Sequence, residues 1–169
     1  MMSLPQYYET ALQLGEALSE RGWMMACAES CTGGLLSAAI TDVAGSSQWF
    51  ERGFVTYSNE AKVEHLRVGI DTLERFGAVS EETAMEMAGG LLAAVPQAQL
   101  AISTTGVAGP GGGSAGKPVG MVCFGFAHRA GEGVSTQAVT RVFEGDRREI
   151  REAAVAFALA TSLQLILPR

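Results

Sequence analysis

The sequence has few of the residue types on which metal sites, disulfide frameworks and histidine-based catalysis depend. Among its 169 residues there are only 3 cysteines and 2 histidines. Cys27, Cys31 and Cys123 show neither a C-x-x-C pair nor a zinc-ligand spacing, and an odd number of cysteines fits a reducing cytoplasm. His65 falls in a helical stretch and His128 at a strand end, each without a ligand partner. We therefore expect no metal, no cofactor and no Ser–His–Asp triad.

The sequence also lacks an excess of positive charge and any long apolar run. Its formal net charge is −6, so no basic stripe is available to bind nucleic acid by releasing counterions from phosphates. No stretch approaches the roughly 18 uncharged apolar residues of a membrane span. The N-terminal residues show no basic region followed by an apolar core, so they do not resemble a signal peptide. These absences predict a soluble cytoplasmic protein whose partner is a small molecule, and neither nucleic acid nor a membrane.

The length and the pattern of apolar residues predict one α/β domain over residues 1–169. Helical spacing or composition is found over 5–20, 35–45, 59–68, 80–95 and 147–167. Short apolar strands are predicted at 23–30 and 51–58, the segment 99–110 is a strand followed by a loop, and 119–129 with 133–145 predict a hairpin. Because strands and helices alternate before a late hairpin, we expect a single-domain α/β/α sandwich with a mixed sheet.

Local signals mark where several of these helices begin and end. Asn59, Ser80 and Asp146 stand at expected N-cap positions, where a short polar side chain can accept hydrogen bonds from first-turn amides. Gly22 and Gly45 follow two expected helices, and a glycine just past a helix commonly ends it.

The segment G-P-G-G-G-S-A-G-K-P-V-G at 109–120 looks at first like a nucleotide-binding loop. From Gly111 it fits the Walker A pattern G-x-x-x-x-G-K-[ST] except at the last position, which is Pro118. Proline has no hydroxyl to hold Mg²⁺ and no amide, and Lys117 leads into strand formers where a helix is required. The glycines therefore need another explanation, and Lys117 either assists an anion site electrostatically or pins the turn.

Three loops rich in small and hydroxyl-bearing residues, 28–34, 56–62 and 103–113, follow the expected strands. In such sheets ligands bind beyond the carboxyl ends of strands, beside helix N-termini. Ser30 lies between a strand and the Gly33-Gly34 start of a helix, where unpaired amides can hold a developing oxyanion. The plainer interpretation is that Ser30 and Thr32 cap the helix, and the residues alone leave both interpretations open.

A serine nucleophile needs a base, and the chain has two lysines, Lys62 and Lys117, against ten arginines. A lysine can lose its proton when burial removes it from water, whereas an arginine effectively cannot. Lys62 lies one turn into an expected helix, five residues after Tyr57. A Ser30–Lys62 pair, with Tyr57 as proton relay or orienting group, is therefore chemically sensible, and the alternative is a solvated helix lysine.

Seven motifs lie in order along nearly the whole chain. They are A-E-S-C-T-G-G at 28–34, A-G-S-S-x-W-F-x-R-G at 44–53, V-T-Y-S-N-E-A-K at 55–62, G-A-V-S-E at 77–81, T-G-V-A-G-P-G-G-G at 105–113, K-P-V-G at 117–120 and G-D-R at 145–147. Together they resemble the CinA C-terminal domain family. The resemblance implies hydrolysis of the carboxamide of nicotinamide mononucleotide to nicotinic acid mononucleotide and ammonia, within pyridine-nucleotide salvage.

The resemblance also implies roles for individual residues. Carried over position by position, Ser30 is the nucleophile, Lys62 the base and Tyr57 its neighbour, and glycines 109–113 form an anion-binding nest for the 5′-phosphate or ribose. Burial and a nearby positive charge such as Arg147 are expected to lower the pKa of Lys62. The residues expected to bind substrate are Thr32, Gly33, Ser47, Thr105, Gly106, Gly109, Gly111, Gly112 and Arg147.

Two alternatives come from other functional classes. One is a non-catalytic nucleotide-binding or regulatory module of the competence and damage-inducible type, which would leave Lys62 solvated and protonated. The other is a cysteine-dependent amidase that uses Cys31, although no histidine is placed to activate it. The final helical segment, A-A-V-A-F-A-L-A-T-S-L-Q-L-I-L, is apolar almost all round, which predicts a homo-oligomer.

Overall fold

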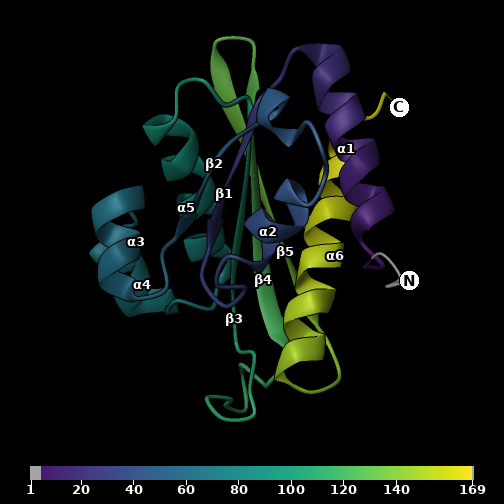
Figure 1. Cartoon of the computed structure of the whole chain (residues 1–169). Helices are drawn as coiled ribbons and strands as arrows, with labels where there is room; N and C mark the ends of the chain where they lie inside the picture. The colour runs from purple at the N-terminus through teal and green to yellow at the C-terminus, as the bar shows by residue number, and fades with distance from the viewer. Residues whose placement is uncertain (1–4, 169) are drawn as a thin grey trace.

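A five-stranded sheet forms the middle layer of the computed structural model, which describes residues 5–168 (Figure 1). The strand order is β2-β1-β3-β4-β5. The strands are β1 (Met25–Glu29), β2 (Phe50–Val55), β3 (Leu100–Gly106), β4 (Met121–Ala130) and β5 (Gly133–Val142). β1 pairs in parallel with both β2 and β3, whereas the β3–β4 and β4–β5 pairs are antiparallel. The predicted mixed sheet and late hairpin are therefore confirmed.

Helices cover both faces of the sheet (Figure 1). One face is covered by α1 (Tyr8–Arg21), α2 (Leu35–Thr41) and α6 (Arg147–Ile166), and the other by α3 (Asn59–Leu66), α4 (Ile70–Phe76) and α5 (Glu81–Ala94). A short 3₁₀ turn, η1 (Ser46–Gln48), precedes β2. None of the helices in this described part of the chain has the length and apolar character needed to cross a membrane.

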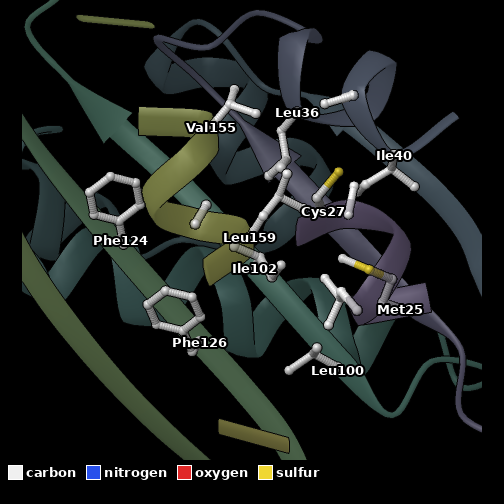
Figure 2. Close-up of a cluster of buried hydrophobic side chains, with 14 of the residues drawn as sticks. Met25, Cys27, Leu36, Ile40, Leu100, Ile102, Phe124, Phe126, Val155 and Leu159 are labelled. Carbon is white, nitrogen blue, oxygen red and sulfur yellow. The ribbon is translucent and has the colours of Figure 1, made fainter. Parts of the chain in front are cut away.

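The alternation of side chains along the central strands divides the core into two parts. Met25 and Cys27 of β1 point into the larger core, formed with α1, α2 and α6, which Figure 2 shows with Phe124, Phe126 and Leu159. The other face carries small residues, Ala26, Ala28, Ala101 and Ala127, against Met87, Leu91 and Leu92 of α5. Small side chains on this face let α5 lie close to the sheet.

Most of the predicted helix ends are correct, and two need correction. Ser80 accepts a hydrogen bond from the Thr83 amide at 3.1 Å, Asp146 forms a capping box with Glu149, and Gly22 ends α1 in the left-handed conformation. The N-cap of α3, however, is Ser58, because its extended backbone lets Oγ accept from the Ala61 amide at 3.0 Å, whereas Asn59 is already helical.

The second correction concerns α2, which ends at Thr41, before Gly45. Gly45, with φ of 83°, instead precedes the 3₁₀ turn η1. Helix α4 was not predicted at all, because its seven residues bury none of their side chains completely and so carry little helical pattern.

The parallel arrangement of β1, β2 and β3 determines where a ligand can bind. The carboxyl ends of parallel strands lie at the same edge of a sheet. The turn after β1, the loop after β2 and the glycine-rich loop after β3 therefore meet there, which brings together the three loops singled out from the sequence. Helix α6 begins beside the same edge.

One glycine fixes the distance between α3, which carries Lys62, and α5. A Cβ added at Gly90 would lie 1.8 Å from the carbonyl oxygen of Leu66, at the end of α3. At the neighbouring Gly89, an added Cβ would meet only the Thr136 side chain, at 3.9 Å, which is ordinary contact. The backbones of the two helices can therefore approach this closely only with glycine at position 90.

We predict that Gly90→Ala destabilises the protein by about 1–3 kcal/mol, the usual cost of overpacking, because α3 must shift. Gly89→Ala, the matched control, should be neutral or stabilising by up to about 1 kcal/mol, because alanine is the better helix former. Urea unfolding of both variants measures the difference. Equal stability of the two variants would contradict the close approach at Gly90.

Candidate active site

A cavity of about 350 Å³ lies at the carboxyl edge of β1, β2 and β3. Ligand sites in proteins are commonly clefts of a few hundred Å³ at this position of an α/β sheet. The lining residues come from the turn after β1, the loop after β2, the segment before α5, the glycine-rich loop and the start of α6. They are Ser30, Cys31, Tyr57, Asn59, Lys62, Ala78, Val79, Thr105, Gly106, Val107, Ala108, Gly109, Gly111, Gly112 and Arg147.

Ser30 and Lys62 are in direct contact in this cavity. The Lys62 ammonium donates a hydrogen bond to Ser30 Oγ at 3.0 Å, and Ser30 Oγ donates to the Tyr57 carbonyl at 3.3 Å. Lys62 comes from the first turn of α3, which the Ser58 cap starts directly after the loop that follows β2. The structure thus brings together the two residues that the sequence singled out as nucleophile and base.

Lys62 is buried, with a relative exposure of 1%. Burial lowers its pKa, because the charged ammonium loses hydration; Cys31 and Glu60 act in the opposite direction. Cys31 can raise the pKa of Lys62 only in its ionised form, as a thiolate. Burial raises the pKa of Cys31 itself to about 12, so its thiol is protonated near neutral pH. The cause named by the sequence, burial, is therefore the main one, whereas Arg147 is not among the causes.

Two backbone carbonyls complete the surroundings of the Lys62 amine. Lys62 Nζ donates to the Tyr57 carbonyl at 3.0 Å and to the Ser58 carbonyl at 3.4 Å. A neutral amine has two N–H bonds and one lone pair. If the two carbonyls accept those N–H bonds, the lone pair is left for the hydroxyl proton of Ser30.

Tyr57 contributes to this pair through its backbone. Its side chain borders the cavity but is 62% exposed, and its carbonyl is the atom that contacts both Ser30 and Lys62. Of the two roles expected of Tyr57, the contacts of its carbonyl fit the orienting one, and a role for its phenol as a proton relay stays a prediction.

The glycine-rich loop lines the cavity opposite Ser30. Gly106, Gly109, Gly111 and Gly112 all border it, as predicted. The loop leads into strand β4, so it does not have the strand–loop–helix context of a Walker A motif. Arg147, at the start of α6, borders the cavity too and donates from Nη1 to the Gly109 carbonyl at 2.7 Å.

Thr105 and Lys117 hold the walls of the site in place. Thr105 borders the cavity, but its hydroxyl donates to the Ala78 carbonyl at 2.7 Å and so ties β3 to the segment before α5. Lys117 does not line the cavity; its ammonium hydrogen-bonds the carbonyl of Phe76 at the end of α4. Of the two roles left open for Lys117, the structure therefore favours pinning the turn.

Three residues expected to bind substrate are not among those that line the cavity. Thr32 is fully buried, and its hydroxyl pairs with that of Thr104 at 2.7 Å. Gly33 lies in a left-handed turn that leads into α2. Ser47 lies in η1, before β2 begins, whereas the cavity is at the end of β2. Ser47 is therefore at the opposite end of its strand from the cavity, whereas Thr32 and Gly33 directly follow the cavity-lining Cys31, and their contacts with substrate stay predictions.

Glu29, which was not predicted as a functional residue, organises the turn that carries Ser30. Glu29 ends β1 and is fully buried, and its carboxylate accepts hydrogen bonds from the amides of Leu36 and Ser37 at 2.7 and 3.0 Å. The Ser37 hydroxyl donates to it as well, at 2.7 Å. The sequence does hold a signal for this role. Glu29 precedes a helix that has no side-chain cap, and a carboxylate is stabilised near a helix N-terminus.

Comparison with known proteins identifies the family of the chain. A model of the CinA C-terminal domain family matches residues 8–166. This chain belongs to the CinA C-terminal domain family. Over 163 residues it is 52% identical to a nicotinamide-nucleotide amidohydrolase PncC of Enterobacter agglomerans, covering 96% of this chain and 97% of the relative. The protein of the same name from Escherichia coli K12 is 52% identical over 155 residues, 92% of each chain.

Solved structures support the same grouping. A crystal structure of a competence/damage inducible protein from Agrobacterium tumefaciens matches this CinA C-terminal domain with a TM-score of 0.87 and 45% identity. The match covers 97% of this chain and 99% of the other. The α/β sandwich observed here is therefore the fold of the family.

The side chains of this CinA C-terminal domain favour Ser30 over Cys31 as the reactive group. Both border the cavity, but Ser30 contacts the Lys62 amine, whereas the Cys31 thiol is held protonated by its raised pKa of about 12. Among residues 5–168, no group of three or more histidine, cysteine or acidic side chains is arranged to hold a metal ion.

Proposed function

We propose that the chain hydrolyses the carboxamide of nicotinamide mononucleotide to nicotinic acid mononucleotide and ammonia. The observation that carries the proposal is the 3.0 Å contact between Ser30 Oγ and the buried Lys62 amine, at the edge of a cavity of suitable size. Relatives that are 52% identical over nearly the whole chain are nicotinamide-nucleotide amidohydrolases, which supports the choice of substrate.

In the proposed reaction, Ser30 Oγ attacks the carboxamide carbon while the neutral Lys62 amine accepts the hydroxyl proton. The tetrahedral oxyanion then collapses, the C–N bond breaks, and Lys62 returns the proton to the departing nitrogen, which leaves as ammonia. Water next attacks the ester on Ser30 with Lys62 again as base. Nicotinic acid mononucleotide leaves, and Ser30 regains its proton.

Backbone amides are the groups that would stabilise the oxyanion in this proposal. Within residues 5–168, the amide of Cys31, directly after the nucleophile, donates to no backbone carbonyl. It is therefore available to the developing negative charge. The glycine-rich loop and Arg147 would hold the 5′-phosphate or ribose, through loop amides and the guanidinium.

We also propose a metal-free, cofactor-free role in pyridine-nucleotide salvage in the cytoplasm. The alternative, a nucleotide-binding regulatory module without turnover, requires a solvated and protonated Lys62. That alternative fits the structure poorly, because Lys62 is buried and its pKa is lowered.

We predict that the purified protein releases ammonia from nicotinamide mononucleotide and that the release survives exhaustive chelation. Ser30→Ala should lose turnover by several orders of magnitude, because the nucleophile is gone. Cys31→Ala, the matched control at the next position, should keep most of it. Ammonia release and chromatography of the product measure all three proteins. Loss of activity in Cys31→Ala with retention in Ser30→Ala would reverse the assignment of the nucleophile.

We predict that Lys62→Arg is nearly as inactive as Lys62→Ala, because arginine keeps the charge but cannot give up a proton at these pH values. In the wild type, kcat/KM should rise with pH through a free-enzyme pKa below the ordinary lysine value, because only the neutral amine can accept the Ser30 proton. Steady-state kinetics measured from about pH 5 to about pH 10 test the direction of the change in kcat/KM. Substantial activity in Lys62→Arg would make Lys62 an electrostatic group and exclude it as the base.

We further propose that the chain works as a homo-oligomer. On α6, Phe157, Leu163 and Leu165 pack against the core but remain only partly buried, which leaves apolar surface for a second copy of the chain. Light scattering at micromolar concentration should give a mass above the 17.7 kDa of one chain. A monomer under those conditions would contradict the proposal.

A further inference from the structure

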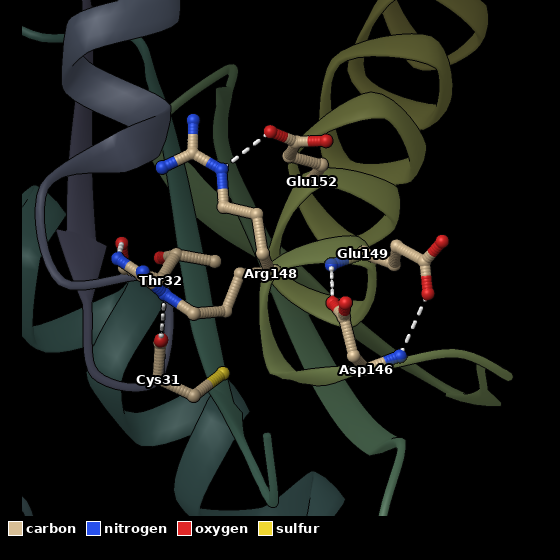
Figure 3. Close-up of polar contacts among 7 residues, drawn as sticks. Cys31, Thr32, Asp146, Arg148, Glu149 and Glu152 are labelled. Carbon is tan, nitrogen blue, oxygen red and sulfur yellow. Dashed lines mark hydrogen bonds and ion pairs between the residues drawn. The ribbon is translucent and has the colours of Figure 1, made fainter. Parts of the chain in front are cut away.

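Two arginines on α6 bind backbone carbonyls of two loops that line the cavity. Arg147 donates to the Gly109 carbonyl of the glycine-rich loop at 2.7 Å. Arg151, one turn further along the helix, donates from Nε to the Cys31 carbonyl at 3.1 Å and from Nη2 to the Thr32 carbonyl at 3.0 Å. Figure 3 shows Cys31 and Thr32 beside the beginning of α6. The start of one helix thus contacts both walls of the site.

Hydrogen bonds to β3 and to the start of α2 hold the two ends of the turn that carries Ser30. The Ser30 amide donates to the Thr104 carbonyl of β3 at 3.0 Å, and Glu29 binds the first amides of α2. The Thr32 carbonyl accepts from the Leu35 amide at 2.9 Å in addition to Arg151. In the described chain, however, the Cys31 carbonyl has Arg151 as its one hydrogen-bond donor.

The guanidinium fits this position better than any other cation. Its planar fork presents two N–H groups in fixed directions, which match two successive carbonyls, whereas a lysine ammonium offers a single point charge. A hydrogen bond from a charged donor to a carbonyl is also stronger than a neutral one. Arg151 therefore restrains the orientation of the Cys31–Thr32 and Thr32–Gly33 peptide planes.

We propose that Arg151 is a positioning residue for the nucleophile. By holding the carbonyls of Cys31 and Thr32 against α6, it keeps the short turn in the conformation that places Ser30 Oγ 3.0 Å from Lys62 Nζ. Arg151 itself is not among the residues that line the cavity, so it acts through the turn and does not touch substrate. The inference rests on the proposed function for the role of Ser30 as nucleophile and for the choice of substrate.

The first experiment compares Arg151→Met and Arg151→Lys with Arg148→Met. Arg148 lies on the same turn of α6, but its exposed side chain pairs with Glu152 (Figure 3) and is not among the residues that line the cavity, so its loss should leave activity unchanged. We expect Arg151→Met to lower kcat by about 10- to 100-fold with little change in KM, because displacing a nucleophile by about 1 Å has effects of this size. Arg151→Lys should recover only part of the loss.

A second readout separates positioning from folding and from substrate identity. In the wild type a sulfonyl fluoride should label Ser30, as measured by mass spectrometry, at a rate that depends on its contact with Lys62. Arg151→Met should label more slowly although circular dichroism reports a folded protein, and methylguanidine should restore part of the rate in Arg151→Ala.

Each outcome of these measurements has a definite consequence. If the wild type labels at Ser30 but does not hydrolyse nicotinamide mononucleotide, the proposed function is wrong while the labelling rates still test Arg151. If Arg151→Met keeps the wild-type kcat and the wild-type labelling rate, the positioning role is overturned. If it loses both only in proportion to its unfolded fraction, Arg151 is merely structural and the proposal is overturned as well.

Discussion

The site depends on one unfavourable placement, a lysine amine buried beside a serine hydroxyl. Removing an ammonium from water costs several kcal/mol, so such a group either loses its proton or gathers hydrogen-bond acceptors. The Lys62 amine has two such acceptors, the carbonyls of Tyr57 and Ser58, and the same carbonyls can also accept hydrogen bonds from the neutral amine. Several other features of the fold keep Lys62 and Ser30 in these positions.

Three elements share that task. Helix α3 delivers Lys62, and its distance from α5 is set by the close approach at Gly90. Strand β1 delivers Ser30, with its backbone fixed by β3 and by the buried Glu29 carboxylate. Helix α6 closes the arrangement from the other face of the sheet, through arginine contacts to loop carbonyls. Apart from the local contact of Glu29 with the start of α2, these contacts join parts of the chain that are distant in sequence, so the site exists only when the whole sandwich has formed.

Ser30 and Cys31 are adjacent in the chain, but their different surroundings give them different reactivities. Ser30 and Cys31 are neighbours at the same cavity, and a free thiol is by nature the stronger nucleophile. Burial keeps the Cys31 thiol protonated, while the contact with Lys62 gives the serine a base. Hydroxyls nearby serve structure instead: Thr32 pairs with Thr104, and Thr105 holds the Ala78 carbonyl. The cavity is consequently lined mainly by glycine, small side chains and backbone.

By itself the sequence determined the features that short-range physics controls. The mixed sheet, the late hairpin, the caps at Ser80 and Asp146 and the loops that could hold a site all follow from periodicity, turn chemistry and the rule that ligands bind beyond strand carboxyl ends. The pairing of Ser30 with Lys62 was also within reach, because few residues in the chain could act as a base. The family motifs added the expected substrate.

Only the tertiary structure decided which end of a strand each residue occupies and which partner it meets. Ser47 belongs to a family motif but lies before β2, at the edge away from the cavity, and the Tyr57 ring faces outward while its carbonyl faces Lys62. Arg151 reaches the turn of Ser30 across 120 positions of sequence. Such contacts are set by the packing of α6 across the sheet, and no local pattern records a hydrogen bond between groups so far apart in the chain.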